Sequence, residues 1–384
     1  MATLIFDKYF INDKVEKKLG ECLVNSLIFF IIMKRRTILR GLPLAPFLSK
    51  KIFIHSNTQD IVNQELICKK TMKPKRLKLG DTLGVIAPSS AINDNKIEQA
   101  IKSLTDFGFK LKLGKNLRAQ NGYLAGTDAQ RLEDLHWAFS DKEVDAVWCI
   151  RGGYGATRIL PNVDFNLIKK NPKIFIGYSD ITALHVAIYQ KTGLVTFHGP
   201  VGTSDYTDFT KPNVLNILMN PTPQYILNPS AENLKNESNL FKPEVITPGK
   251  CRGKLIGGNL SLLSAMDGTP YALKDLKGKI LFMEDIDERP YRIDRMLTQM
   301  LQAHDFKQLA GIALGVFEGC NPKPEENSQS LIDCLKERLG QLGIPVMYGL
   351  SFGHISNQLT LPVGIEAELN TEGGVLTLLE AAVV

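Results

Sequence analysis

The sequence lacks paired cysteine motifs and phosphate-binding loops, and each absence removes a class of protein. Its six cysteines form no C-x-x-C pair and no metal-ligand spacing, so neither a disulfide framework nor a common zinc site is indicated. No G-x-x-x-x-G-K-[ST], H-E-x-x-H or D-x-D-x-D-G motif occurs, which argues against a P-loop, a zincin and an EF-hand. Cys149, inside the apolar run V-W-C-I, is predicted to be a buried reduced thiol.

The net charge of +6 is concentrated near the N-terminus. Residues 1–78 hold 16 Lys and Arg against 6 Asp and Glu, whereas the remaining residues hold 30 against 34. A nucleic-acid-binding protein normally carries its basic patch on the folded domain. Because the body of this chain is slightly acidic, we exclude nucleic acid as a partner.

Residues 1–72 form an N-terminal extension that differs from the rest. Its apolar run, 27–33, is far shorter than the roughly 18 to 20 residues of a membrane-spanning helix, so no stable membrane insertion is predicted. The text around Lys34-Arg35-Arg36 resembles a twin-arginine export signal with an interrupted apolar region. Three interpretations stay open: a periplasmic export signal, a non-functional extension, or a start codon upstream of the true one at Met33.

A length of 384 residues exceeds what one compact core usually holds, so two domains are expected. From Leu79 onward, strands and helices alternate, and a capping box, Thr127-x-x-Gln130, opens one helix. The predicted apolar strands lie at 82–87, 144–150 and 174–176. This order predicts a parallel sheet with helices on both faces, in an N-terminal α/β domain of Rossmann or flavodoxin-like type over residues 73–201.

Residues 202–250 are polar and contain six prolines, and we interpret them as an inter-domain connection. A C-terminal β/α domain is predicted over residues 251–384. In this domain Pro290 marks a helix start, and the apolar residues after it recur at helical spacing. Its further strands are predicted at 279–283, 310–317, 345–350 and 358–362.

Reactive side chains collect at four predicted strand ends, where the active sites of open parallel sheets lie. These ends are 151–155, 177–180, 284–287 and 352–354. In G-Y-S-D, Ser179 stands at a strand-to-helix turn, where its hydroxyl can project from the sheet edge and the helix N-terminus favours an anion. The third glycine of G-x-S-x-G is absent, and this tetrapeptide alone favours a role for Ser179 as a helix cap.

His354 and Glu284 are the candidate base and its orienting acid. His354 lies in a glycine-flanked loop, and Glu284 directly follows an apolar strand, a position from which a carboxylate can orient an imidazole. A lone loop histidine is more often structural, and Glu284 has two alternatives, a metal site or a solvated acidic loop. His198 ends another strand and is a secondary candidate; the other histidines are assigned to packing, to the extension or to a helix end.

The segment R-G-G-Y-G at 151–155 fails the G-x-G-x-x-G pattern, because Arg158 occupies the place of the third glycine. Its N–H groups at a strand end suit an oxyanion hole, and Arg151 is a candidate partner for a substrate carboxylate. A purely structural tight turn explains the segment equally well.

Several long motifs occur in one order along the chain. They are G-D-T-L-G-V-I-A-P-S-S (80–90), R-G-G-Y-G-A (151–156), G-Y-S-D-I-T (177–182), H-G-P (198–200), G-G-N-L-S-L-L (257–263), L-F-M-E-D-I-D-E-R-P-Y-R-I-D-R-M-L (281–297), F-G-H (352–354) and L-P-V-G (361–364). From 79 to 379 the chain thereby resembles the L,D-carboxypeptidases. These serine peptidases include the muramoyl-tetrapeptide carboxypeptidases and the microcin C immunity proteins.

The resemblance implies a Ser-His-Glu triad at the interface of two domains, with Ser179 as nucleophile, His354 as base and Glu284 as its orienting acid. We assign the oxyanion hole to the backbone N–H groups of Gly153 and Asp180. No metal and no organic cofactor are implied. The implied substrate is the murein tetrapeptide or a related small peptide, which loses its C-terminal D-alanine. The resemblance also implies a homodimer and a cytoplasmic role in murein recycling.

Two rival functions stay open. The first keeps the chemistry but hydrolyses an aminoacyl-nucleotide analogue, which needs an aromatic platform for the base; Trp137 and Trp148, the only tryptophans, are predicted inside a helix and a strand instead. The second is a non-catalytic two-domain protein that closes on a ligand between its lobes. It leaves unexplained why Ser, Glu and His all occur at strand ends, and a serine-directed phosphonate separates it from the enzyme.

Overall fold

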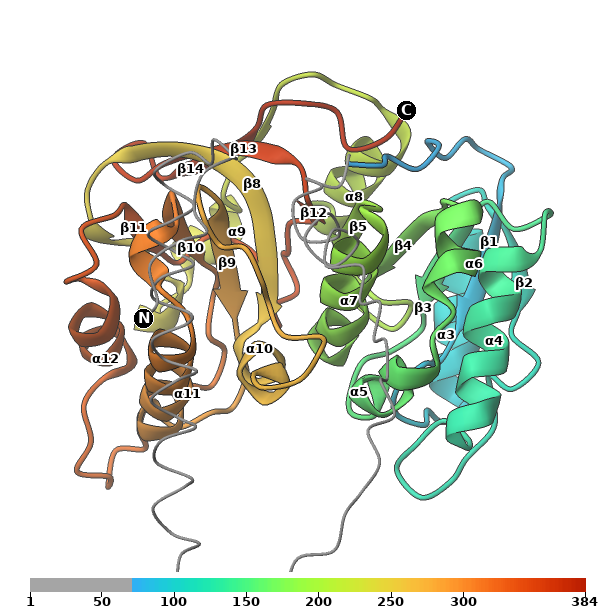
Figure 1. The fold of residues 1–384 in the computed structure, drawn as a ribbon, viewed down its shortest axis with the longest axis horizontal. Helices are drawn as coiled ribbons and strands as arrows, with labels where there is room; N and C mark the ends of the chain where they lie inside the picture. Colours follow the sequence, from blue (N-terminus) through green and yellow to red (C-terminus); the bar gives the residue numbers. More distant parts are fainter. Residues whose placement is uncertain (1–70) are drawn as a thin grey trace, which may run out of the picture. The chain divides into compact units, whose positions relative to one another are not determined.

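The computed structural model describes residues 71–384 (Figure 1). The predicted extension, with its twin-arginine-like segment, lies outside the described residues except for its last two positions. The described part contains one sheet of six strands and one of eight. None of its helices is long and apolar enough to cross a membrane. Cys149 is buried and carries a free thiol, as predicted.

The first sheet has the strand order β12-β5-β4-β3-β1-β2, and every neighbouring pair except β12 and β5 is parallel. Its strands are β1 (Thr82–Ile86), β2 (Lys110–Leu113), β3 (Ala146–Cys149), β4 (Ile174–Gly177), β5 (Thr196–His198) and β12 (Leu361–Val363). The helices along it are α3 (Asp94–Thr105), α4 (Asp128–Ser140), α5 (Ala156–Ile159), α6 (Phe165–Lys170) and α7 (Thr182–Thr192). The predicted parallel α/β arrangement is confirmed.

Alternating side chains of the central strands explain why helices cover both faces of this sheet. On β3, Val147 and Cys149 pack into one apolar cluster with residues of α4 and α7, whereas Ala146 and Trp148 pack into a second cluster with residues of α3. Every residue of β3 and β4 is buried. This two-sided burial is why both strands appear in the sequence as short, continuous apolar runs.

Two helix starts follow their sequence signals. The Thr127 side chain accepts a hydrogen bond from the Gln130 N–H, and the Gln130 side chain accepts one from the Thr127 N–H, which forms the predicted capping box of α4. Pro290 is the first residue of α11 (Pro290–Ala303), where its missing N–H would have no intrahelical partner in any case.

The second sheet is mixed, in the order β6-β14-β13-β8-β9-β10-β11-β7. A parallel centre, β8 to β11, is flanked by antiparallel strands on both sides. The strands are β6 (Tyr225–Leu227), β7 (Glu244–Thr247), β8 (Lys250–Asn259), β9 (Ile280–Glu284), β10 (Gly311–Leu314), β11 (Val346–Tyr348), β13 (Glu366–Asn370) and β14 (Val375–Leu378). Helices α10 (Leu260–Met266) and α12 (Leu331–Leu339) join α11 in this part of the chain.

Chain segments cross between the two sheets. The predicted connection, 202–250, contains α8 (Thr210–Met219) and α9 (Ala231–Lys235) and supplies the edge strands β6 and β7 of the second sheet. Strand β12, which follows β11 in the chain, pairs instead with β5 of the first sheet, with Leu361 opposite His198. The residue bounds of the two domains stay a prediction.

Helix α7 lies between the two sheets and packs against both α10 and β8 (Figure 1). Ile181 and Leu184 share an apolar cluster with Leu260 of α10 and Leu281 of β9. The carboxyl ends of β4 and β9 are therefore held near each other by a common core, and the candidate residues lie at these ends.

Candidate active site

Ser179 lies in a sharp turn at the end of a buried strand. After Gly177, the last residue of β4, Ser179 adopts a left-handed backbone with φ 64°, and α7 begins three residues later. Only three non-glycine residues between 71 and 384 have positive φ, so this conformation is unusual. No side chain caps α7 or the short 3-10 turn before it. The helix-cap interpretation of Ser179 is therefore wrong, and its hydroxyl is not engaged in capping.

The glycine loop after β3 runs directly beside this turn. A Cβ atom on Gly152 would lie 3.0 Å from the Ser179 Cβ, and one on Gly153 would lie 2.4 Å from Ser90 Oγ. Gly153 has φ 106°, so glycine is required there on both counts. Within residues 71–384, the N–H groups of Gly153 and Asp180 donate to no acceptor. Both are therefore available to an anion that develops beside Ser179.

The Asp180 side chain points into the protein and braces the glycine loop. Its Oδ2 accepts hydrogen bonds from Ser89 Oγ at 2.6 Å and from the Ala156 N–H at 2.8 Å. Burial raises the pKa of the Asp180 carboxyl above its ordinary value, although these hydrogen bonds oppose the shift. The Asp180 carboxylate therefore supports the loop, while its backbone N–H is available to a ligand.

Ser89 and Ser90 belong to the site but were not predicted as site residues. Ser90 Oγ accepts a hydrogen bond from the Tyr154 N–H at 2.9 Å and so contacts the glycine loop directly. Ser89 acts through Asp180, which accepts from the Ala156 N–H just after the loop. They follow strand β1 in the sequence A-P-S-S. That position, at the same sheet edge as Ser179, is the signal that could have identified them.

Arg151 is exposed at the start of the glycine loop. Its Nη1 donates to the Ala91 carbonyl oxygen at 2.7 Å, which fixes the side chain across the loop. No carboxylate in the described part of the chain pairs with it. The guanidinium thus keeps donors for an external carboxylate, and its pairing with a substrate stays a prediction.

Glu284 and His354 form a hydrogen-bonded pair. Glu284 is the last residue of β9 and is fully buried, and its Oε2 accepts from His354 Nδ1 at 2.7 Å. Gly353 permits this approach: its φ is 116°, and a Cβ there would lie 3.1 Å from the Glu284 Cβ. Because Nδ1 is engaged, the Nε2 atom of His354 remains for a reacting group.

Burial and charge act in opposite directions on this pair. Burial alone would lower the pKa of His354, but the charge and hydrogen bond of Glu284 raise it above its ordinary value. Burial alone would raise the pKa of Glu284, but His354 lowers it below its ordinary value. Glu284 therefore stabilises the protonated imidazole that a general base must form.

Tyr178 brings the serine turn next to the histidine loop. Its ring centroid lies 4.8 Å from that of His354, and Tyr178 directly precedes Ser179. Ser179 and His354 do not form a hydrogen bond in this structure. In serine hydrolases that bond often closes only when substrate is present.

His198, the secondary candidate for the base, lies on the other side of Glu284. Its Nε2 is 3.9 Å from Glu284 Oε1, and its side chain is buried. Burial lowers the pKa of His198 to about 4. A histidine that substrate cannot reach does not serve as the general base, so His354 is the better candidate.

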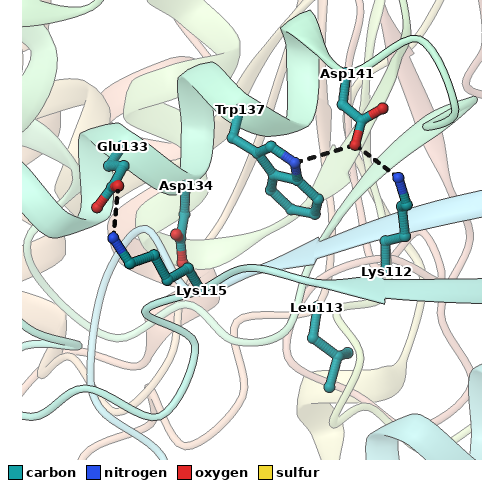
Figure 2. A pocket seen from close by; sticks show the side chains of 7 residues that line it. All are labelled: Lys112, Leu113, Lys115, Glu133, Asp134, Trp137 and Asp141. Carbon is teal, nitrogen blue, oxygen red and sulfur yellow. Dashed lines mark hydrogen bonds and ion pairs between the residues drawn. The ribbon is translucent and has the colours of Figure 1, made fainter.

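The geometry bears on two alternatives raised by the sequence: a metal site at the acidic residues, and an aromatic platform formed by a tryptophan. Between residues 71 and 384, no three His, Cys, Asp or Glu side chains are grouped so that they could hold a metal ion. Trp148 is buried in β3. Trp137 lines a cavity of about 350 Å³ between α4 and β2 (Figure 2).

The cavity beside Trp137 lies at the far edge of the first sheet. β2 and β5 occupy opposite halves of the strand order, and β5 is the strand that carries His198. Four charged side chains that line the cavity form two ion pairs: Lys115 with Glu133, and Lys112 with Asp141 (Figure 2). Asp141 also accepts from the Trp137 indole N–H. Neither tryptophan therefore provides an aromatic platform beside Ser179.

The chain is similar to known proteins over most of its described length. A family model described as the LD-carboxypeptidase N-terminal domain matches residues 83–199, and one described as the LD-carboxypeptidase C-terminal domain matches residues 252–369. The chain is 45% identical over 306 residues to a probable murein peptide carboxypeptidase of Bacillus subtilis, which covers 78% of this chain and 92% of the relative. It is 36% identical over 303 residues to the murein tetrapeptide carboxypeptidase of Pseudomonas aeruginosa, covering 75% and 92%.

A solved structure shares the fold. The microcin C7 self-immunity protein MccF in its apo state superposes with a TM-score of 0.74 and 26% identity, and the match covers 82% of this chain and 100% of that chain. In sequence, MccF of Escherichia coli is 30% identical over 332 residues, or 79% of this chain and 94% of MccF. Given these matches across both halves of the described part, the chain belongs to the LD-carboxypeptidase family of peptidases.

Proposed function

We propose that this enzyme is a serine L,D-carboxypeptidase that removes the C-terminal D-alanine from murein tetrapeptides. The observation that carries the proposal is the 2.7 Å hydrogen bond from His354 Nδ1 to Glu284 Oε2, next to the left-handed turn of Ser179. Two relatives are named murein peptide and murein tetrapeptide carboxypeptidases, which supports the choice of substrate.

In the proposed reaction, His354 Nε2 takes the proton from Ser179 Oγ as the oxygen attacks the carbonyl that precedes the terminal D-residue. The N–H groups of Gly153 and Asp180 donate to the oxyanion. His354, stabilised by Glu284, then gives the proton to the departing amine, and D-alanine leaves. Water hydrolyses the acyl-enzyme with His354 again as base, which restores Ser179.

Arg151 is proposed to bind the substrate's terminal carboxylate. Its guanidinium lies on the glycine loop that holds Gly153, and this places a positive charge beside the oxyanion donors. A planar guanidinium binds a carboxylate through two parallel hydrogen bonds. Such binding selects a substrate whose scissile bond lies one residue from a free carboxyl end, which is the defining property of a carboxypeptidase.

The same triad would also serve an immunity-type hydrolase of aminoacyl-nucleotide analogues, and MccF is a relative. Trp137 lines the cavity between α4 and β2, and Trp148 is buried in β3, so neither tryptophan can stack on a nucleobase bound beside Ser179. We therefore prefer the murein peptide. The proposal includes a homodimer and a cytoplasmic location, which sedimentation and cell fractionation would test.

The test is release of free D-alanine from murein tetrapeptide by the full chain. Wild type should release it, and Ser179→Ala should release essentially none. Ser328→Ala, at an exposed serine far along the chain from the triad, serves as the matched control and should behave as wild type. A tetrapeptide with a terminal L-alanine should be a poor substrate. Equal release by wild type and Ser179→Ala would refute the proposal.

A further inference from the structure

Glu284 has a second oxygen that the triad does not use. Oε2 accepts from His354, but Oε1 is buried and has no hydrogen-bond partner within the described residues. A buried, unpaired carboxylate oxygen is strongly unfavourable, so a donor is expected close by. The amide of Asn259, on the neighbouring strand β8, donates to Asp285 at 3.1 Å. It also acts on Glu284 and lowers the pKa of that carboxyl, but it forms no hydrogen bond of standard geometry with Oε1.

His198 carries the complementary unpaired groups. Both of its ring nitrogens are buried without a partner in the described part, and Nε2 lies 3.9 Å from Glu284 Oε1. The ring is confined by the aromatic rings of Phe282 at 5.4 Å and of Tyr178 at 6.1 Å. Its backbone pairs with strands on both sides. The imidazole is therefore held close to the carboxylate, with 3.9 Å between Nε2 and Oε1.

We propose that His198 is a positioning residue whose neutral imidazole donates its Nε2–H to Glu284 Oε1. A rotation of either side chain would shorten 3.9 Å to a hydrogen bond of about 2.9 Å. This bond fixes the carboxylate in the orientation in which Oε2 holds His354. The inference rests on the triad of the proposed function and adds a fourth member that does not touch substrate.

The groups that face this cluster favour a neutral His198. Tyr178 covers both imidazoles, Asp285 and Asp287 act on His354 by their charge, and His185 lies beyond His198, with ring centroids 6.4 Å apart. Burial lowers the pKa of His198 to about 4 and that of His185 to about 3. Both histidines are therefore uncharged at neutral pH, where His198 can donate a hydrogen bond without adding a charge.

The bond would change the pKa of His354 as well as its orientation. When Glu284 shares its charge between two donors, it stabilises the His354 imidazolium less strongly. Without His198, the pKa of His354 should rise, because the full carboxylate charge then acts on it. A merely structural role for His198 would lower activity without moving this pKa.

The test compares His198→Gln with His198→Met in the full chain. The two replacement side chains have similar length and volume, but only the amide of glutamine can donate to Oε1. Each protein is reacted with a serine-directed phosphonate across pH 4–9, and the rate of labelling at Ser179 is followed by mass spectrometry. Melting temperatures show whether both variants fold. If His198→Met does not fold, His198→Leu takes its place.

We expect His198→Gln to label at close to the wild-type rate, with the same acid limb. His198→Met should label about 10- to 100-fold more slowly at neutral pH, the loss of one hydrogen bond to a charged group, with its acid limb moved to higher pH. Equal behaviour of the two variants, or a slower methionine variant with an unmoved acid limb, would overturn the inference. Because labelling needs no peptide, failure of the murein substrate is seen separately, as wild-type labelling without D-alanine release.

Discussion

Glu284 and His354 owe their chemical properties to each other, because both are buried and each would be less stable in its charged form alone. The 2.7 Å bond between them holds His354 Nδ1, and Nε2 has no hydrogen-bond partner among residues 71–384. At the scale of single residues, the carboxylate therefore sets both the orientation and the basicity of the imidazole.

Replacing Glu284 by glutamine should keep the shape of the site and remove the charge. We expect kcat/KM for D-alanine release to fall by about 10³- to 10⁴-fold, because the amide neither fixes the tautomer nor stabilises the imidazolium. Since Glu284 raises the pKa of His354, the acid limb of the pH profile should move to lower pH. The comparison variant is Glu318→Gln, at a half-buried carboxylate, which should move neither quantity. An unmoved acid limb in Glu284→Gln would contradict the assignment.

The sequence identified Ser179, Glu284 and His354 as strand-end residues, but it could not show how they are oriented. The sequence G-Y-S-D is compatible with a serine that caps the following helix. Only the structure, in which Ser179 has φ 64° and α7 has no side-chain cap, distinguishes a sharp turn from a helix cap. His198 was predicted as a secondary candidate base because it ends a strand. Its burial against Glu284 could not be predicted, because that burial depends on β4, β5 and β12 coming together. Such long-range packing leaves no local signal in the sequence.

At the scale of secondary-structure elements, two short segments position the proposed catalytic groups: the glycine loop after β3 and the loop that carries His354. Each is held by side chains from elsewhere in the chain, the first by Ser89 and Ser90, the second by residues at the start of α8. The geometry of these loops is therefore sensitive to single hydrogen bonds.

Gly153→Ala should disable the oxyanion hole without removing any side-chain chemistry. The new Cβ would lie 2.4 Å from Ser90 Oγ, so the loop must shift and carry its N–H away from Ser179. We expect kcat to fall by about 10²- to 10³-fold, as for loss of one oxyanion donor. Gly268→Ala is the matched control, because Gly268 also has positive φ but open space around it. Equal activity of the two variants would argue against an oxyanion role for Gly153.

Thr210, the first residue of α8, holds the His354 loop by its buried hydroxyl. Oγ1 donates to the Ser356 carbonyl oxygen at 2.6 Å and accepts from the Gln358 N–H at 2.9 Å. Thr210→Val keeps the shape and should lower kcat by about 10-fold, together with about 1–3 kcal/mol of stability, because both partners lose their hydrogen bond. Thr210→Ser should restore both. Kinetics and urea unfolding measure the two effects, and an unchanged kcat in the valine variant would show that the loop is held by other contacts.

Most central elements were predictable because apolar runs, a capping box and Pro290 mark them locally. The hairpin of β13 and β14 was missed although its burial alternates along each strand, as a period-two pattern would suggest. The edge strands β6 and β7 were missed for a different reason. They lie in a proline-rich, polar stretch whose strand character comes from pairing with distant strands rather than from its own residues.

At the scale of the whole molecule, buried neutral histidines should make the fold sensitive to acid. The pKa of His185 is lowered to about 3 and that of His198 to about 4, both by burial. An unfolded histidine titrates near 6.5. The unfolded state thus binds more protons below this pH, so stability should fall as the pH drops from about 6.5 to about 4. It should fall less steeply between about 4 and about 3, where only His185 still titrates, and level off below.

Two such histidines set a slope of up to about 3 kcal/mol per pH unit in that window. His354, whose pKa is raised in the folded protein, acts the other way: its contribution is present below pH 6.5 and is lost as the pH rises through its folded pKa. Urea unfolding from pH 4 to 8 measures the contribution of the two buried histidines and the opposite contribution of His354. In His185→Phe, the slope of the free energy of unfolding against pH in this window should decrease by the equivalent of about one proton. An unchanged slope would show that His185 is not buried in its neutral form.

The triad can be tested as a unit by measuring kcat/KM for D-alanine release in wild type, Ser179→Ala, His354→Gln and the double variant. Residues that act in one step give losses that are not additive. If Ser179 and His354 work together, the double variant should be within about 3-fold of the worse single variant. If the two losses multiply instead, Ser179 and His354 act independently, and the proposed mechanism is wrong.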